Sequence, residues 1–208
     1  MATQSALGSG VSSRIALARS RRAGISVEQA LSQRRSVRHF ASRALSLEQI
    51  SQLLWACQGV SSGDGKRTAP SAGALYPLTC WLIARRITDI GEGVYRYHPY
   101  PEGLEVWKPG DFAGSVAEAA FDQQWIASAP AILAITAAIS RTAARYGSRA
   151  ERYVFMEAGH AAQNVYLQAR SLGLGTVMVG AFDDAAMAQI LSLTPGETPV
   201  ALLPVGRP

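Results

Sequence analysis

The chain has 208 residues, of which 48% are hydrophobic and 17% are charged, and its formal net charge is +5. This length predicts one domain, or two small ones. Globular chains contain about 25% charged residues, so the low charged fraction argues against disorder and is typical of a protein that buries part of its surface in an oligomer.

The positive charge is concentrated near the N-terminus. Four arginines and no acidic residue precede Glu28, whereas residues 28–208 carry 16 basic and 15 acidic side chains. A nucleic-acid-binding domain carries its basic patch on the folded surface, so this distribution argues against that class. We expect residues 1–25 to form a disordered or extended arm and residues 26–208 to form the folded domain.

Cysteine content and hydropathy indicate the cellular compartment of the protein. Cys57 and Cys80 each lie in an apolar segment and are interpreted as reduced, buried thiols, not as a disulfide framework. Two isolated cysteines and three scattered histidines predict no metal site. The longest apolar run, residues 129–139, is shorter than the roughly 20 residues of a membrane-spanning helix. The N-terminus lacks the apolar core of a secretory signal. We expect a cytoplasmic protein.

Capping residues and periodicity predict the first elements. Ser26 begins a helix that ends near Arg34. Ser46 and Gln49 have the spacing of a capping box, and the helix that they begin ends near Gly59. The segments that follow are a loop over residues 60–69, a strand over 77–87, and a hairpin with strands over 93–97 and 104–108.

Helices and strands are also mixed in the second half of the chain. The predicted elements are a helix over 113–127, a buried strand over 131–139, a helix over 150–172, a strand over 176–179, a helix from Asp183 to Leu193, and a closing strand over 200–205. This interrupted alternation predicts an α+β sandwich of one sheet among several helices.

One side of the helix predicted over residues 150–172 is made of small residues. They are Ala158, Ala161, Ala162, Val165 and Ala169. Two interpretations remain open, because such a side packs equally well in the core of its own chain or against a second subunit.

Residues 34–40 (RRSVRHF) could bind an anion. In an extended segment, Arg34, Ser36 and Arg38 point to the same side, and clustered guanidinium groups donate hydrogen bonds to phosphate oxygens. A solvated basic turn is the alternative interpretation.

Two other segments could contact a ligand through their backbones. Residues 69–77 (APSAGALYP) have small side chains that let a flat ligand approach closely. Residues 179–184 join a predicted strand to a predicted helix, where backbone N–H groups can face a ligand. Either segment alone also has a purely structural explanation.

These segments occur in the order of the motifs of the nitroreductase superfamily, which the chain resembles from residue 26 to residue 208. Residues 34–40 resemble its first FMN motif. Residues 70–77 resemble the second motif, in the form found in the SagB-type, azoline-oxidase-like branch. The stretches that continue the pattern are EAGHAAQN (157–164), GLG (173–175), VGAFDD (179–184) and PVGRP (204–208).

The resemblance implies a nitroreductase-like α+β sandwich, with a central, mostly antiparallel sheet flanked by helices. It also implies a homodimer with two FMN sites at the subunit interface. The residues that it assigns to the phosphate and ribityl end of FMN are Arg34, Ser36 and Arg38, with Arg35 as a second charge or backbone contact and Arg207 as a late candidate. The residues that it assigns to the isoalloxazine are Pro70, Ser71, Ala72, Gly73 and Leu75 of the partner subunit, and the backbone N–H groups of Gly180 and Ala181.

The implied activity is that of an FMN-dependent oxidoreductase with ping-pong hydride transfer. NAD(P)H reduces the flavin, and a small electron-poor acceptor such as a nitroaromatic, quinone or activated alkene reoxidises it. Two alternatives remain open: FMN-dependent oxidation of peptide-derived azoline-type rings, and a flavin-binding or interaction protein without catalysis. Azoline-oxidase relatives typically have a Lys-Tyr pair where this chain has Arg145-Tyr146. Tyr146 is a candidate acid or base, whereas the guanidinium of Arg145 keeps its proton.

Overall fold

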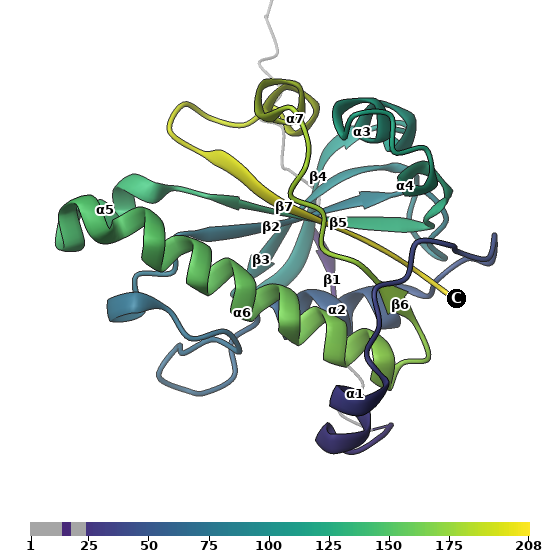
Figure 1. Cartoon of the computed structure of the whole chain (residues 1–208), viewed down its shortest axis with the longest axis horizontal. Coiled ribbons are helices and arrows are strands. Elements are labelled where there is room, and N and C mark those ends of the chain that lie inside the picture. Colours follow the sequence, from purple (N-terminus) through teal and green to yellow (C-terminus); the bar gives the residue numbers. More distant parts are fainter. Residues whose placement is uncertain (1–13, 18–23) are drawn as a thin grey trace, which may run out of the picture.

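The structure, a computed structural model, describes residues 14–17 and 24–208. Most of the expected N-terminal arm, residues 1–25, lies outside the described residues. A single antiparallel sheet lies between two layers of helices (Figure 1), which confirms the predicted α+β sandwich. In the described part of the chain, no helix is long and apolar enough to cross a membrane.

The sheet has seven strands in the order β1-β4-β3-β2-β5-β7-β6. Their bounds are β1 Arg14–Ala16, β2 Leu78–Ala84, β3 Gly93–Pro99, β4 Glu102–Pro109, β5 Ala131–Ala137, β6 Gly175–Thr176 and β7 Thr198–Gly206. At its centre, Leu82 of β2 lies opposite Leu133 of β5, which lies opposite Leu203 of β7. Every residue of β5 is buried, so this strand requires cover on both faces of the sheet.

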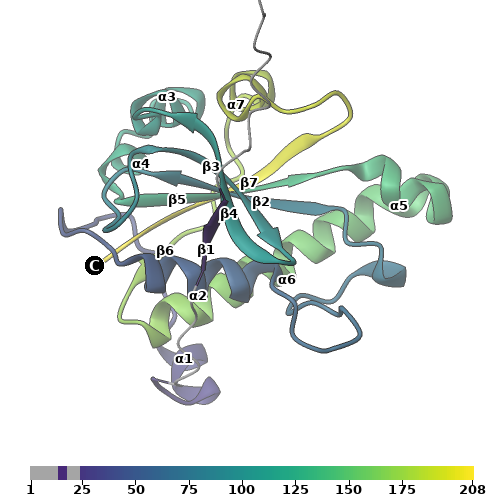
Figure 2. The same ribbon diagram turned by 180° about the vertical axis from the view of Figure 1, so that it is seen from behind.

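Helices supply that cover (Figures 1 and 2). One face carries α1 (Val27–Gln33), α2 (Leu47–Gln58) and α6 (Ala150–Ser171), and the other carries α3 (Ala113–Ala119), α4 (Trp125–Ser128) and α7 (Asp184–Leu191). Successive side chains of β2 point to opposite faces of the sheet. Cys80 and Leu82 belong to the core beneath α2 and α6. Trp81 and Ile83 belong to the core beneath α3 and α7.

The predicted starts of three helices are confirmed. Ser26 and Ser46 each accept a hydrogen bond from the amide three residues later, and each forms a complete capping box with its glutamine. Asp183 accepts a hydrogen bond from the Ala186 amide at the start of α7. These side chains satisfy donors that the first turn of a helix leaves without a partner.

The single helix predicted over residues 113–127 is wrong. The structure has two short helices there, α3 and α4, separated by a turn in which Phe121 and Asp122 have φ of 57° and 59°. The carbonyl of Ala119 accepts a hydrogen bond from the Asp183 amide at 2.8 Å. This tertiary bond engages a carbonyl at the end of α3 and ties the turn to the start of α7.

The chain after β5 also differs from the prediction. The strand predicted to reach Ile139 ends at Ala137, and helix α5 (Ile139–Tyr146) follows it. The predicted strand over residues 176–179 is shortened to β6, while Val179 forms a separate bridge with Leu202. Helix α7 ends at Leu191, two residues before the predicted end, and Ser192 adopts a left-handed conformation.

The small residues of α6 face the sheet of their own chain. All five predicted members of that side are buried, which favours the core interpretation for this side. The opposite side of α6 exposes Phe155 and Met156, whose exposed fractions are 50% and 55%. The apolar surface available to a second subunit therefore lies on the other side of the helix.

Residues 34–41 lie along β6 and are held there by main-chain contacts. Ser36 forms an isolated parallel bridge with Thr176, and the Val37 amide donates to the Thr176 carbonyl at 3.0 Å. Gly175 makes the approach possible, because a Cβ at this position would lie 2.6 Å from Cγ2 of Val37.

We therefore expect Gly175→Ala to lower the free energy of unfolding by about 1–3 kcal/mol, the usual cost of overpacking. Gly114→Ala in α3 is the matched control, because an added Cβ there meets no atom within 4 Å. It should be neutral or stabilise the protein by about 0.5–1 kcal/mol. Urea unfolding of both variants checks the prediction, and equal effects would contradict it.

Candidate functional site

Tyr166 of α6 is the centre of the first part of the candidate site. Its hydroxyl accepts a hydrogen bond from the Met178 amide at 2.8 Å and lies 3.4 Å from Oγ of Ser36. The guanidinium of Arg34 lies over the Tyr166 ring, 5.3 Å from its centroid. Tyr166 therefore links the RRSVR segment to the chain that follows β6.

A cavity of about 240 Å³ opens beside Tyr166. Arg34, Arg35 and Arg170 contribute to its wall, and no aspartate or glutamate side chain lines it. Arg170 is oriented by a 3.1 Å hydrogen bond from its Nε to Oε1 of Gln33. We call the cavity and residues 34–38 the arginine corner. Three guanidinium groups favour an anion with several acceptor oxygens.

The other residues predicted for this end, Ser36, Arg38 and Arg207, do not line the cavity. Ser36 and Arg38 are exposed, and the Arg38 guanidinium lies 6.0 Å from the centroid of the Trp125 ring in α4. Arg207 is joined to the segment by the hydrogen bond from the Ala41 amide to its carbonyl. Its Nε is buried and has no hydrogen-bond partner among the described residues.

Gly180 and Ala181 come shortly after Met178 and are both exposed. The Ala181 carbonyl accepts a 3.3 Å hydrogen bond from Nε2 of Gln123, in the turn between α3 and α4. Within the described chain, no residue accepts a hydrogen bond from the amide of either residue. These two amides are therefore available to a ligand beside the arginine corner.

The second part of the candidate site is the loop of residues 70–76. Ser71 Oγ accepts a hydrogen bond from the Tyr76 amide at 2.9 Å. Between them, the short 3-10 helix η1 (Ala72–Ala74) contains Gly73 with φ of 60°. Pro70, Gly73 and Ala74 are exposed, whereas the rings and chains of Leu75 and Tyr76 are partly buried.

The predicted acid or base Tyr146 lies against this loop. A Cβ on Gly73 would lie 2.8 Å from the Tyr146 hydroxyl and 2.9 Å from Nη1 of Arg145. The Tyr146 ring packs edge-on against Tyr153 of α6, with centroids 5.1 Å apart. The ends of the Arg145 and Tyr146 side chains therefore lie directly against Gly73 of the 70–76 loop.

A buried polar group beneath the loop was not predicted from the sequence. Glu157 of α6 is 3% exposed. Burial raises the pKa of its carboxyl group, while a hydrogen bond from Ser71 and the charge of Arg67 lower it. Arg67 donates to Oε1 of Gln58 at 2.9 Å, and burial lowers the pKa of its guanidinium. The EAGHAAQN motif marks Glu157, but nothing in the sequence shows that its carboxyl group meets Ser71.

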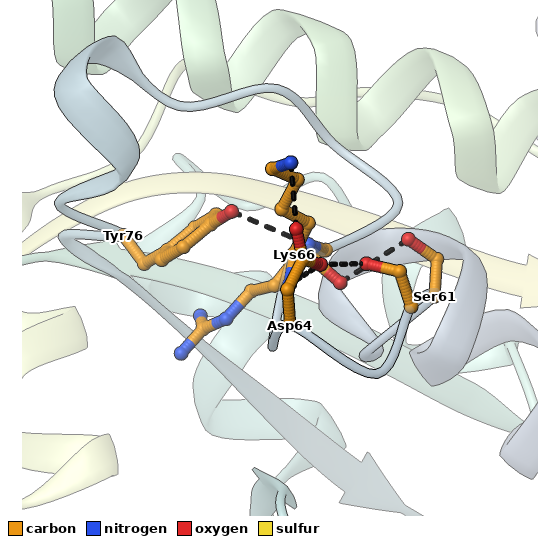
Figure 3. A network of polar contacts seen from close by, with 6 residues as sticks. Ser61, Asp64, Lys66 and Tyr76 are labelled. Atoms are coloured by element: carbon orange, nitrogen blue, oxygen red, sulfur yellow. Dashed lines mark hydrogen bonds and ion pairs between the residues drawn. The ribbon is translucent and has the colours of Figure 1, made fainter.

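Local contacts shape the chain that leads into this loop (Figure 3). Ser61 Oγ donates to the Lys66 carbonyl at 3.1 Å, and hydrogen bonds from Lys66 and Ser62 lower the pKa of Asp64. The Arg67 amide donates to the Tyr76 hydroxyl at 3.4 Å, and the Arg67 guanidinium stacks 4.6 Å from the centroid of the same ring. The contacts between Arg67 and Tyr76 thus join the chain before the 70–76 loop to the end of that loop.

The two parts of the candidate site lie at different ends of α6. Glu157 marks the 70–76 loop and Tyr166 marks the arginine corner, which the helical rise places about 14 Å apart along the axis. Figure 1 shows α5 beside one end of α6 and α1 with β6 near the other. A single chain therefore does not bring residues 70–73 to residues 34–38.

Comparisons with known proteins agree with this architecture. The model of the nitroreductase family matches residues 31–207. A protein of Methanocaldococcus jannaschii named as a nitroreductase is 46% identical over 183 residues, which are 88% of this chain and 91% of that protein. A crystal structure of a nitroreductase-type protein from Ralstonia eutropha is 30% identical, with a TM-score of 0.82, and the match covers 95% of this chain and 91% of that one.

The NADPH:FMN oxidoreductase of Vibrio harveyi, complexed with NAD+, shares the fold. It is 20% identical with a TM-score of 0.63, and the match covers 88% of this chain and 68% of that one. The family match includes the arginine corner, the 70–76 loop and α6, and the archaeal relative is similar over nearly its whole length. The chain belongs to the nitroreductase family.

Proposed function

We propose that this protein is an FMN-dependent oxidoreductase that transfers hydride from NAD(P)H to a small electron-poor acceptor. The observation that carries the proposal is the arginine corner, a cavity lined by three arginines and no acidic side chain, beside the exposed amides of Gly180 and Ala181. Membership of the nitroreductase family supports an oxidoreductase. The structural similarity to an NADPH:FMN oxidoreductase supports the choice of cofactor.

The chemistry of the donors fits FMN. In this proposal Arg34, Ser36 and Arg38 hold the phosphate and the ribityl chain, and Arg35 adds a second charge. Arg207 lies close to this segment and has a buried Nε without a partner among the described residues, so an added anion would satisfy it. Phosphate bound by several guanidinium groups gains bidentate, charge-assisted hydrogen bonds.

The flavin, when bound, supplies the hydride chemistry itself, so no protein nucleophile is required. The role of this chain is to bind and orient. In this proposal the amides of Gly180 and Ala181 would donate hydrogen bonds toward the ring, and Gln123 holds the adjacent Ala181 carbonyl. The arginine corner also supplies positive charge, which favours the electron-rich, reduced state of the cofactor.

A homodimer would complete each site. Phe155 and Met156, with the exposed Gly159, form an apolar surface near the middle of α6. A two-fold contact uses the same surface on both copies, and in this proposal it brings the 70–76 loop of one copy to the arginine corner of the other. This arrangement would let residues 70–73 line the ring from the partner subunit.

A second candidate function is the oxidation of azoline-type rings in peptides. It is favoured by the close approach of the Tyr146 hydroxyl and Arg145 to Gly73, which places a proton donor or acceptor at the loop assigned to the flavin ring. In this alternative Tyr146 moves the proton while the cofactor takes the hydride. A flavin-binding protein without turnover is the third reading, and the following experiment separates the three.

The purified protein should be yellow, or should take up FMN, and should oxidise NADH or NADPH in the presence of a quinone or nitroaromatic. Flavin absorbance and steady-state turnover measure this, and rates of about 1–10³ s⁻¹ are typical of enzymes. Oxidation of an azoline peptide without pyridine nucleotide supports the second function instead. Binding without any turnover supports the third, and failure to bind FMN contradicts all three.

The double variant Ser36→Ala/Arg38→Ala should bind FMN at least about a hundred times more weakly. Each hydrogen bond to a charged group contributes about 1.5–3 kcal/mol, so the loss of two such bonds removes at least about 3 kcal/mol. Quenching of FMN fluorescence on titration gives the dissociation constant. Arg43→Ala, which removes an exposed arginine five positions further on, is the control and should leave it unchanged. Wild-type affinity in the double variant refutes the phosphate assignment.

Phe155→Asp/Met156→Asp should convert the dimer to monomers and weaken FMN binding, because two carboxylates cannot be buried in the proposed interface. Sedimentation velocity reports the mass and fluorescence titration reports the binding. The control is Tyr100→Asp, at a position that is 83% exposed at the β3–β4 hairpin, and it should change neither. A monomeric variant with undiminished FMN affinity would show that the site is not shared between subunits.

A further inference from the structure

Two cysteine side chains meet in the core, at a place that the proposed function does not use. Cys57 lies in the last turn of α2 and Cys80 lies in β2, and their sulfur atoms are 2.9 Å apart. The two residues are 0% and 2% exposed. A disulfide bond has a sulfur separation of about 2.05 Å, so a small side-chain adjustment would bring the pair to bonding distance.

In the folded structure, burial protects the two thiols from reaction with an oxidant. The hydrogen bond with Cys80, burial, and the nearby charge of Cys80 together raise the pKa of Cys57. Because the thiolate is the reacting form, the two buried cysteines do not react readily with an oxidant. Oxidation therefore depends on an opening of the surrounding chain.

This opening would involve the chain that joins the two cysteines. The chain between the cysteines contains the exposed residues 61–66 and the 70–76 loop. Residues 61–66 are held by contacts within the segment (Figure 3) and by one isolated bridge, between Val60 and Arg67. Arg67 is near enough for the charge of Cys80 to affect the pKa of its guanidinium. Local opening of this segment would give the sulfurs access to solvent, where a thiol can form the reactive thiolate.

We propose that Cys57 and Cys80 form a reversible redox site that a small-molecule disulfide oxidises to an intrachain disulfide. One thiolate attacks the small disulfide, forms a mixed disulfide and releases one small thiol. The second cysteine then displaces the other small thiol and closes the bond between the two sulfurs. Two protein thiols are oxidised, and one small disulfide is reduced to two thiols.

The disulfide would close residues 57–80 into a covalent loop. This loop contains Arg67 and residues 70–76, so the bond would tie together the two ends of the segment assigned to the flavin ring. The redox site itself does not depend on the proposed function, because its evidence is the contact between the two sulfurs.

The test incubates the folded, full-length protein with oxidised glutathione and then measures its mass after denaturation without reductant. The protein should lose the mass of two hydrogen atoms, and non-reducing proteolysis should give a crosslinked peptide containing Cys57 and Cys80. Dithiothreitol should restore both thiols. The thermal midpoint of the oxidised form should rise by roughly 5–10 °C, because the crosslink restricts the unfolded chain.

Cys57→Ala and Cys80→Ala are the control variants, since alanine suits an apolar core position. Neither variant can form the bond, so neither should show the loss of mass or the reversible rise in thermal midpoint. Three results overturn the proposal: two titratable thiols in the oxidised wild type after denaturation, a stable adduct with glutathione at either cysteine, or a crosslink between two chains.

Discussion

Close packing of α6 on the sheet determines the rest of the architecture. Its inward side is made of alanine and valine, so the helix axis can lie near the strands that it covers. The helix is 22 residues long, and each end positions a different group of functional residues. Glu157 meets the 70–76 loop, and Tyr166 meets the arginine corner. A helix with large inward side chains would lie further from the sheet and would lose both sets of contacts.

The separation along α6 gives the proposed dimer a physical reason. FMN has an anionic end and a flat, apolar end, and the surfaces proposed for these two ends are about 14 Å apart along the helix axis. An exposed apolar surface lies on the same helix, at Phe155 and Met156, directly before Glu157. Burying that surface against a second copy stabilises the assembly through the hydrophobic effect, and the same contact would join the two surfaces in one site.

Local signals explain how much of the fold could be predicted. Ser26, Ser46 and Asp183 act through hydrogen bonds within a few residues of themselves, and these helix starts were predicted correctly. The break near Phe121 depends on a hydrogen bond between Ala119 and Asp183, which are far apart in sequence. Helix α5 has apolar residues at helical spacing, but its start has no side-chain cap, so its strongest local signal is missing.

In the candidate site, too, local patterns could be predicted from the sequence, whereas long-range contacts could not. Arg34 and Ser36 are two positions apart and both lie at Tyr166, as the extended pattern suggests, whereas Arg38 lies at Trp125. Nothing in the order of residues shows that this partner is Tyr166, because Tyr166 reads as an ordinary helical position. The sequence likewise shows Glu157 as the first residue of the EAGHAAQN motif, but its burial beneath Ser71 results from tertiary packing.

The main-chain bonds of residues 34–41 have a consequence for protein synthesis. This segment is made early, yet its partners are Thr176 and the carbonyl of Arg207, which leave the ribosome last. A nascent chain that lacks β6 and β7 has no support for its early arginines and cannot hold an anion in the arginine corner. In the proposed function, cofactor binding would therefore follow completion of the chain through β7.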